Sequence, residues 1–306
     1  MKKYIIVGAN GFIGSSLVEE LAKKNFVIAV DRYSTPPQFK VKGNIEVVKL
    51  DVNKNFKELE KLGKREVSGI VWAVGGAIPA DSIKKKSDIR GPLEALVSLT
   101  KIPMGKGVPI ILTSSAGMLY RPKKSKLTEK SQVEPWTDYG KQKKELEKEL
   151  LNLSKNLPRN NLKILRISSV YGERQPVNRD QGVVAKLILS ALQKQPFILY
   201  GSDSARRDYI YVKDLAKIIH QLLNKKASFQ IINVSTGQGT TLKNLVLMIE
   251  KISKSKIMIS HQEKRQIDPN HIDVSNSLLL DELTSFKFSP LEEGLTQVIN
   301  WYKKNL

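Results

Sequence analysis

Tyr139 and Lys143 are residue types that together can move a proton, and they lie four positions apart in the stretch WTDYGKQKKELEKEL (136–150). On an α-helix, residues four apart share one face, so the phenol and the ammonium group would be neighbours. Lowering a tyrosine pKa from about 10 to about 7 requires roughly 4 kcal/mol, close to the Coulomb energy of a unit charge about 4 Å away at an effective dielectric of about 20. The pair therefore fits general acid/base chemistry near neutral pH.

The residues that follow this pair have the period of an amphipathic helix. Its apolar stripe, at spacings of 4, 3 and 4, consists of Leu146, Leu150, Leu153 and Leu157. Continued backwards, the stripe includes Lys143 and Tyr139, so the lysine is expected to face inward. Burial of an ammonium group is costly unless its charge has a partner or a role. The alternative is a lysine whose amine reaches out of the stripe into solvent.

A glycine-rich turn near the N-terminus suits the binding of a pyrophosphate. Gly8, Gly11 and Gly14 in VGANGFIG have the spacing GxxGxxG, and they connect an apolar run to a helical pattern. The bare spacing is a weak signal, and its position between strand and helix makes it stronger. There, unpaired amide groups and the helix dipole can hold phosphate, and the missing side chains let the ligand approach.

Acidic residues close the next two apolar runs. Asp31 ends FVIAVD and Asp51 follows IEVVKL. An acid at the end of the second strand accepts hydrogen bonds from the ribose diol of adenosine and repels a 2′-phosphate, which favours NAD over NADP. Arg32 follows directly and weakens that preference. Asp51 is similarly placed to meet the adenine edge.

Alternating strand and helix patterns run through the chain and would position these groups. Strands are expected at 3–8, 26–31, 45–50, 67–74, 108–115, 161–168 and 229–234, and helices at 12–24, 54–63, 88–101, 139–157, 182–194, 213–224, 241–252 and 291–304. Near-continuous apolar strands separated by helices predict an α/β fold, a Rossmann-like doubly wound parallel sheet. We expect this domain at 1–170 and a smaller, mixed α/β C-terminal lobe at 171–306, with some segments exchanged between the two.

Composition narrows the range of functions. The chain has 306 residues, no cysteine and three histidines, so disulfides, thiol nucleophiles and cysteine-bound metals are excluded and no metal site is expected. The net charge of +21 favours anionic partners, but the lysines are mixed with acids throughout, as in KELEKEL. We interpret the excess as solubilising lysine, and nucleic acid is not an expected partner.

The N-terminal stretch MKKYIIVGANGFIGSSLVEELA starts like a signal peptide. Its apolar run is broken by Asn10 and the glycines and continues into Glu19 and Glu20 without a small-residue cleavage site. There is no run of about 18 apolar residues elsewhere, so no membrane span is expected. These features predict a cytoplasmic, soluble protein.

The motifs taken together resemble the extended short-chain dehydrogenase/reductase family. They are GxxGxxG, a strand ending in Ser114-Ser115, and YGKQK followed by Glu147. The resemblance implies that Tyr139 is the acid/base catalyst, that Lys143 lowers its pKa and holds the nicotinamide ribose, and that Ser115 hydrogen-bonds the reacting hydroxyl. It implies NAD contacts at Gly8, Gly11, Phe12, Ile13, Gly14, Asp31, Arg32, Asp51, Val52, Ala73, Tyr139 and Lys143.

The second half extends the resemblance over essentially the whole chain. The segments LRISSVYGERQ (165–175), GSDSARRDYIYVKDLAKII (201–219), NVSTGQGTTL (233–242) and SPLEEGLTQVINWY (289–302) are similar to those of NAD-dependent epimerase/dehydratases that act on nucleotide sugars. The resemblance implies that Arg207 and Arg265 bind the nucleotide diphosphate, beside sugar contacts from Ser115 and Tyr139. Guanidinium groups suit two adjacent phosphates.

The sequence departs from the family pattern at three places. Ser115 stands five residues before Tyr120, where four is usual in members similar to UDP-glucose 4-epimerase, so Ser114 is an alternative catalytic residue. Asp88 stands where an asparagine is common. Ala116 and Gly117 replace the Asp-Glu pair of sugar 4,6-dehydratases, and elimination of water needs such an acid and base.

The resemblance therefore implies an NAD-dependent nucleotide-sugar epimerase, most simply 4-epimerisation of a UDP-sugar through a transient 4-keto intermediate. One alternative is a related reductase, dehydratase or decarboxylase, and another is a non-catalytic NAD-binding scaffold or regulator. The family also implies a homodimer that pairs through the helices at 88–101 and 139–157.

Overall fold

A computed structural model gives the fold of the protein. It describes residues 1–52, 54–55, 57–63, 66–75, 94–95, 98, 108–122, 125–155, 162–177, 182–226, 229–264 and 271–306. The helix expected at 88–101, including Asp88, lies almost entirely outside the described residues, as does Arg265.

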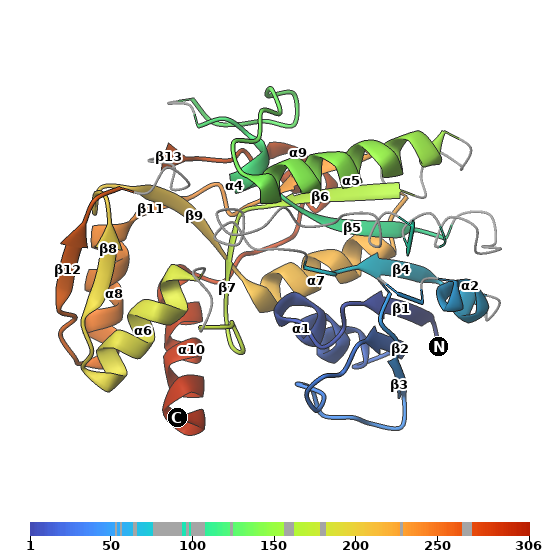
Figure 1. The fold of residues 1–306 in the computed structure, drawn as a ribbon, viewed down its shortest axis with the longest axis horizontal. Helices are drawn as coiled ribbons and strands as arrows, with labels where there is room; N and C mark the ends of the chain where they lie inside the picture. Colours follow the sequence, from blue (N-terminus) through green and yellow to red (C-terminus); the bar gives the residue numbers. More distant parts are fainter. Residues whose placement is uncertain are drawn as a thin grey trace.

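A seven-stranded parallel sheet forms the centre of the molecule (Figure 1). Its strands are β1 (Lys3–Val7), β2 (Phe26–Asp31), β3 (Ile45–Lys49), β4 (Gly69–Trp72), β5 (Ile110–Ser115), β6 (Leu162–Ile167) and β10 (Ile231–Val234). They lie in the order β10-β6-β5-β4-β1-β2-β3, and every neighbouring pair is parallel. The order reverses between β1 and β4, the place where ligands bind in open α/β sheets. The predicted Rossmann-like doubly wound sheet is confirmed.

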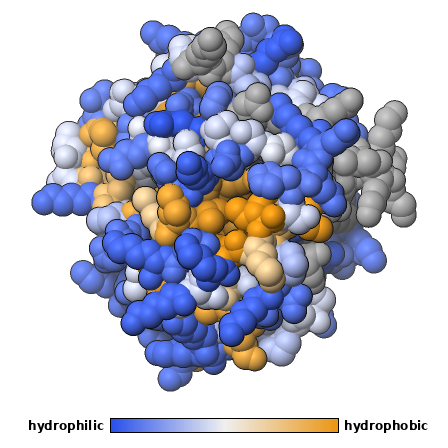
Figure 2. All heavy atoms as spheres, turned by 90° about the vertical axis from the view of Figure 1, so that its left-hand side faces the viewer, coloured by the Kyte–Doolittle hydropathy of each residue, from blue (hydrophilic) through white to orange (hydrophobic). Residues whose placement is uncertain are grey.

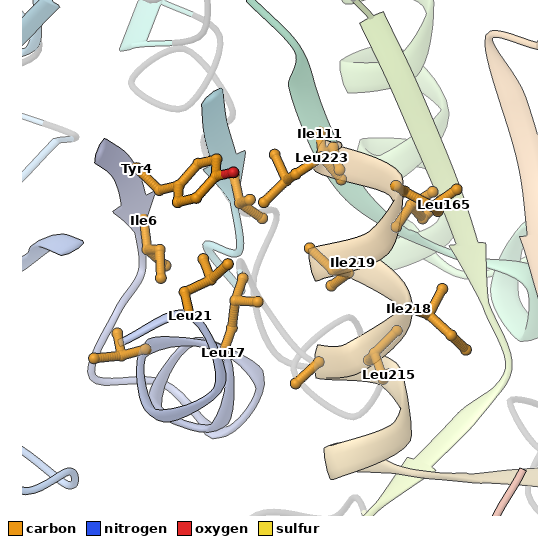
Figure 3. Close-up of a cluster of buried hydrophobic side chains, with 14 of the residues drawn as sticks. Tyr4, Ile6, Leu17, Leu21, Ile111, Leu165, Leu215, Ile218, Ile219 and Leu223 are labelled. Carbon is orange, nitrogen blue, oxygen red and sulfur yellow. The ribbon is translucent and has the colours of Figure 1, made fainter. Parts of the chain in front are cut away.

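Helices cover both faces of this sheet, which explains why its strands are apolar on both sides. Helices α1 (Phe12–Leu21) and α7 (Val212–Leu223) lie on one face, and α2 (Glu58–Gly63) and α5 (Asp138–Ser154) on the other. Strand β1 shows the alternation, because Tyr4 and Ile6 pack towards α1 while Ile5 and Val7 pack in the opposite core. Figure 3 shows Leu17 and Leu21 of α1, Ile111 and Leu165 of the sheet, and Leu215, Ile218, Ile219 and Leu223 of α7 around the first of these cores.

A smaller mixed lobe packs beside the sheet, as expected. Its strands are β7 (Ser169–Tyr171), β8 (Phe197–Tyr200), β9 (Arg206–Tyr211), β11 (Gly239–Thr241), β12 (Ile259–Gln262) and β13 (His271–Ile272). Its helices are α6 (Val183–Gln193), α8 (Leu242–Ser253) and α10 (Leu291–Asn305), and these enclose a core of their own. Strand β9 pairs antiparallel with β11 and parallel with β7 and β13.

Several short elements were not predicted from the sequence. They are β7, β8, β11, β12, β13 and the helices α4 (Ala116–Leu119) and α9 (Ser277–Glu282). Each is too short to show a repeating pattern, and pairing with distant strands or packing on the core decides its conformation.

Segments from the second half of the chain complete the sheet domain. Strand β10 lies beyond residue 170 and pairs with β6, and α7 packs on α1. Both elements therefore belong to the sheet domain, although they lie after residue 170 in the chain.

The surface of the smaller lobe carries apolar residues. Figure 2, which shows the side of β8, β12 and α8, has hydrophobic residues gathered across its middle, with hydrophilic residues above and below. The exposed large hydrophobic residues from this region are Ile198, Leu247 and Met258. None of the helices in the described part of the chain is long and apolar enough to cross a membrane.

Candidate active site

The glycine-rich turn packs tightly between β1, β4 and α1. Gly8 has a φ of +87°, and a Cβ there would lie 2.7 Å from the carbonyl carbon of Ala73, just after β4. A Cβ at Gly14 would fall on the carbonyl oxygen of Gly8 and 2.8 Å from its carbonyl carbon. Both positions therefore require glycine, Gly8 for its left-handed conformation as well as for space.

The turn directs the N-terminus of α1 to the switch point of the sheet. Gly11 is the N-cap, and α1 begins at Phe12 and Ile13 without a side-chain cap, as the described residues show. The amide groups of a first helical turn have no partner within the helix. The turn thus offers uncapped donors, a positive dipole end and glycines that leave room for a ligand, which fits the pyrophosphate of a dinucleotide.

Asp31 is fixed at the carboxyl end of β2 beside this turn. Its Oδ2 accepts a hydrogen bond from the backbone amide of Asn10 at 2.9 Å, and its Oδ1 accepts one from the amide of Arg32 at 2.7 Å. Each carboxylate oxygen keeps a lone pair for a ribose hydroxyl. The side chain of Arg32 is exposed, and after β3, Asp51 is partly exposed while Val52 is buried.

Asn10, which sequence reasoning did not assign to the site, connects the glycine-rich turn to the loop after β2. Its side-chain amide group donates to Thr35 O, Thr35 Oγ1 and Pro36 O, each at 3.2 Å, and its Oδ1 accepts from the Gln38 amide at 2.7 Å. Residues 33–37 of this loop line an open surface pocket of about 400 Å³ together with Val47 and Lys49 of β3. Asn10 therefore joins the glycine-rich turn to the loop that follows Asp31. The sequence clue to this role was the position of an asparagine between two glycines of the turn.

Replacement of Asn10 by alanine is expected to weaken NAD binding about tenfold. The variant loses the bonds that hold the loop 33–38, each worth about 1 kcal/mol net, and a loss of about 1.4 kcal/mol raises a Kd tenfold. Isothermal titration calorimetry measures the Kd for NAD. Asn44→Ala is the matched control, because the Asn44 amide group caps Ala22 O and Asn25 O instead. An unchanged Kd for Asn10→Ala would count against this role.

Helix α5 places Lys143 and Tyr139 beside the end of β5. Lys143 is only 4% exposed, and its Nζ donates to the carbonyl oxygen of Thr113 at 3.1 Å. The same Nζ lies 5.8 Å from the centroid of the Tyr139 ring, and Tyr139 is half-buried. The inward-facing lysine is confirmed. In the expected leucine stripe, Leu146 and Leu150 are buried, while the side chain of Leu153 and all of Leu157 lie outside what the structure describes.

The expected lowering of the Tyr139 pKa is wrong for the protein groups acting by themselves. Burial raises the pKa of Tyr139 to about 12. Burial also lowers the pKa of Lys143 to about 8, which the nearby charge of Glu147 partly opposes. Desolvation disfavours a buried phenolate, and here this cost outweighs the attraction of the ammonium group.

Ser114 and Ser115 differ in their access to the site. The Oγ of Ser114 is buried and has no hydrogen-bond partner among the described residues. Ser115 ends β5, is half-buried and is the residue before α4. An atom without access to solvent cannot touch a ligand unless the site rearranges, so Ser115 is the better placed of the two.

Gly140 explains how α5 approaches this strand end so closely. A Cβ at Gly140 would collide with the carbonyl oxygen of Met118 in α4 and lie 2.8 Å from the Cβ of Pro135. The glycine next to Tyr139 therefore lets α5 pack against α4, which follows Ser115 directly. Sequence reasoning did not single out Gly140, although it is part of YGKQK.

The two arginines expected to meet a diphosphate have different outcomes. Arg207 lies on β9, is half-buried, and donates from Nη1 to the carbonyl oxygen of Arg206 at 2.8 Å. Arg265 lies outside the described residues. The diphosphate role of both stays a prediction.

Curated relatives and solved structures match nearly the full length of the chain. A Methanocaldococcus jannaschii protein, provisionally named UDP-glucose 4-epimerase, is 27% identical over 98% of both chains. The dTDP-4-dehydro-6-deoxyglucose reductase of Escherichia coli is 26% identical over 96% of both. The structure of UDP-N-acetylglucosamine 4-epimerase from Methanobrevibacter ruminantium, in complex with UDP-N-acetylmuramic acid, has a TM-score of 0.86 at 25% identity and covers 100% of this chain and 99% of its own.

The family is settled by a match that extends from the glycine-rich turn through α5 to β10. The model of the NAD dependent epimerase/dehydratase family matches residues 4–235. The glycine cradle, the uncapped start of α1 and the fixed carboxylate of Asp31 fit the cofactor that the family name states. The chain belongs to the NAD dependent epimerase/dehydratase family, and NAD is its cofactor.

Proposed function

We propose that the protein is a nucleotide-sugar 4-epimerase that inverts C4 of a UDP-sugar through a transient 4-keto intermediate. The observation that carries the proposal is the buried ammonium of Lys143 on the same helix face as Tyr139, beside the strand end that bears Ser115. UDP-sugar 4-epimerases among the relatives and solved structures support it.

Tyr139 is the acid/base group of this proposal. Its phenolate takes the proton of the sugar 4-hydroxyl as the C4 hydride leaves, and its phenol returns that proton after the hydride has been restored on the opposite face. NAD, when bound, accepts and returns the hydride. Because each transfer is reversed within one cycle, the reaction consumes no cofactor and changes only the configuration at C4. Burial raises the pKa of Tyr139. Lys143 stabilises the phenolate, because its positive charge and that of oxidised NAD, when bound, would together favour the ionised form.

Substrate recognition is assigned to three further residues. The hydroxyl of Ser115 hydrogen-bonds the reacting sugar hydroxyl, and Arg207 and Arg265 bind the diphosphate, for which guanidinium groups are suited. The net charge of +21 attracts such an anionic substrate to the protein.

The two serines give a paired prediction. Ser115→Ala is expected to lower kcat roughly 10²-fold, as the loss of a hydrogen bond to a reacting oxygen typically does. Ser114→Ala is expected to leave kcat within about twofold, because it removes a buried hydroxyl without a partner among the described residues. Steady-state kinetics on the same sugar measures both. The reverse order of effects would assign the role to Ser114.

The deciding experiment is incubation of the purified protein with UDP-, GDP- and dTDP-sugars, followed by NMR, with and without added NAD. The expected result is interconversion of a UDP-sugar and its 4-epimer with no net change in NAD. A product that is reduced, dehydrated or decarboxylated would replace the proposal by the corresponding reaction. NAD binding without turnover on the whole panel would favour a scaffold or regulator.

We also propose a homodimer whose subunits associate through the segment 88–101 and the helix predicted at 139–157, which is α5 in the structure. The outer face of α5 is charged and exposed at Lys141, Lys144, Glu145 and Lys148. Analytical ultracentrifugation over a range of protein and salt concentrations measures the oligomeric state. A monomer under all of these conditions would contradict the proposal.

A further inference from the structure

A buried polar network lies one helical turn beyond Lys143, on the inward face of α5. Glu147 of α5 is 3% exposed and forms an ion pair with Arg166 of β6, whose Nη2 lies 2.7 Å from Glu147 Oε2 and whose Nε also donates to both carboxylate oxygens. The Nη1 of Arg166 donates to the phenol oxygen of Tyr120 at 2.9 Å, and that phenol donates to Asn233 Oδ1 of β10 at 2.8 Å. The network thus ties α5 to two strands of the central sheet.

Glu147 follows Lys143 by one helical turn on the same inward face. The two residues are four apart, and both are almost fully buried. The hydrogen bond of the Lys143 ammonium goes to a neutral carbonyl, Thr113 O. A neutral acceptor does not balance a buried charge, whereas a carboxylate one turn away does so in part. Among the described residues, Glu147 is the acid whose charge acts on Lys143.

A second buried lysine among the described residues shows a different arrangement. Lys163 of β6 donates to two backbone carbonyls at the C-terminal end of α7, Leu222 O in the last turn and Lys225 O just beyond it, and the charge of Glu282 raises its pKa. Two carbonyls at a helix C-terminus, where the dipole is negative, hold that ammonium in place. Lys143 has no helix terminus of this kind among the partners that the structure gives it, so the charge of Glu147 matters more there.

We propose that Glu147, held by Arg166, is a positioning residue that keeps the ammonium of Lys143 charged beside Tyr139. The inference rests on the proposed role of Tyr139 and Lys143 in catalysis. Glu147 touches neither substrate nor cofactor and acts only through Lys143. Arg166 has the opposite effect on Lys143, because it shares the negative charge of Glu147 and is itself a cation.

The titratable groups around Glu147 agree with this assignment. The groups that face Glu147 are Lys143 on the same helix, Arg166 on β6 and Tyr120 after α4. The charge of Glu129 acts on Tyr120 in turn. Burial lowers the pKa of Lys143 to about 8, and Glu147 raises it. A lysine with such a pKa is close to losing its proton at neutral pH, so removal of the carboxylate charge would leave much of it neutral.

The test is the titration of Lys143 itself, followed by NMR of labelled lysine in the full-length protein and assigned with a Lys143→Arg variant. Glu147→Gln keeps the shape and removes the charge, and it is expected to move the midpoint down by about one pH unit or more. Arg166→Met removes the cation that shares the negative charge of Glu147, so the carboxylate acts on Lys143 alone. This variant is expected to move the midpoint up. Glu145→Gln, an exposed position on the same helix, is the matched control and should move it in neither direction.

The opposite signs separate a charge effect from a structural one. A network that only stabilised the fold would leave the Lys143 midpoint unchanged or shift it in the same direction in both variants, and either result would overturn the proposal. If a single variant fails to fold, Glu147→Gln combined with Arg166→Met removes both charges together, which buried ion pairs tolerate better. That double variant is still expected to titrate below the wild type, and an unshifted midpoint would again overturn the proposal.

The pH dependence of turnover gives a second readout. The alkaline limit of kcat is expected to move down with the Lys143 midpoint in Glu147→Gln. If the wild type shows no turnover on any sugar but the midpoints shift as expected, the proposed reaction fails and the role of Glu147 stands. If turnover is present but the midpoints do not shift, the reaction stands and this inference fails.

Discussion

Tyr139→Phe is expected to abolish measurable turnover and to leave NAD binding within about twofold of the wild type. The phenol is the group that gives and takes the proton in the proposed reaction, and loss of a general acid/base costs roughly 10²–10⁴-fold in rate. The substitution removes one oxygen from a half-buried ring on α5, far less than is needed to disturb the glycine cradle. Kinetics on the active sugar and calorimetric titration with NAD measure the two effects.

Tyr4→Phe is the matched control for this substitution. The Tyr4 phenol donates to Asn224 Oδ1 at 3.1 Å, away from the end of the sheet where Tyr139 lies. Like Tyr139→Phe, the Tyr4→Phe variant loses one tyrosine oxygen, but it is expected to keep full turnover. An undiminished rate for Tyr139→Phe would refute the assignment of Tyr139, whatever reaction the enzyme performs.

The ultraviolet titration of Tyr139, taken as the difference between wild type and Tyr139→Phe, adds a direct measurement to this prediction. Without cofactor the midpoint is expected near pH 12, because burial raises the pKa of Tyr139 to that value. With oxidised NAD bound, the added positive charge is expected to lower the midpoint, since nearby positive charge favours the phenolate.

Gly14→Ala is expected to destabilise the protein by about 3 kcal/mol or more and to abolish NAD binding. An alanine Cβ would fall on the carbonyl oxygen of Gly8 and 2.9 Å from the Cα of Ala9. These are backbone atoms, so the side-chain adjustments that limit the cost of overpacking to about 1–3 kcal/mol are not available. The start of α1 must move away from β1, and the uncapped amides that suit a pyrophosphate move with it. Denaturant unfolding and NAD titration check the two parts.

Gly117→Ala is the control for the effect of an added methyl group. It lies in α4 near the site, and a Cβ there meets no atom within 4 Å in the described part of the chain. It is expected to be neutral or slightly stabilising, because alanine favours the helix. Wild-type stability and NAD affinity in Gly14→Ala would show that the turn is not built as described.

Local periodicity was sufficient for the elements that carry the chemistry. Strands β1, β2, β4, β5 and β6 and helix α5 lie where the apolar patterns predicted them, because each buries a face set by its own residues. The same patterns placed the glycines between β1 and α1 and put Lys143 on the inward face of α5. The family and its cofactor followed from these motifs.

Residues that act through distant partners could not be found in this way. The loop 33–38 returns to Asn10, and α4 packs on α5 at Gly140. Glu147 belongs to a motif visible in the sequence, but its partner Arg166 is brought beside it by β6. No repeating pattern in the sequence links any of these residues to its partner. The difference between Ser114 and Ser115 is likewise a matter of burial.

The sequence by itself determined the sheet domain, the glycine-rich turn, the Tyr139–Lys143 pair and the family, since these depend on residue type and spacing over one or two elements. Only the tertiary structure decided the electrostatics of the pair. Burial raises the pKa of Tyr139 and lowers that of Lys143, and the charge of Glu147 opposes part of the lowering at Lys143. Desolvation depends on everything packed around a group, and residues far apart in the chain supply that packing.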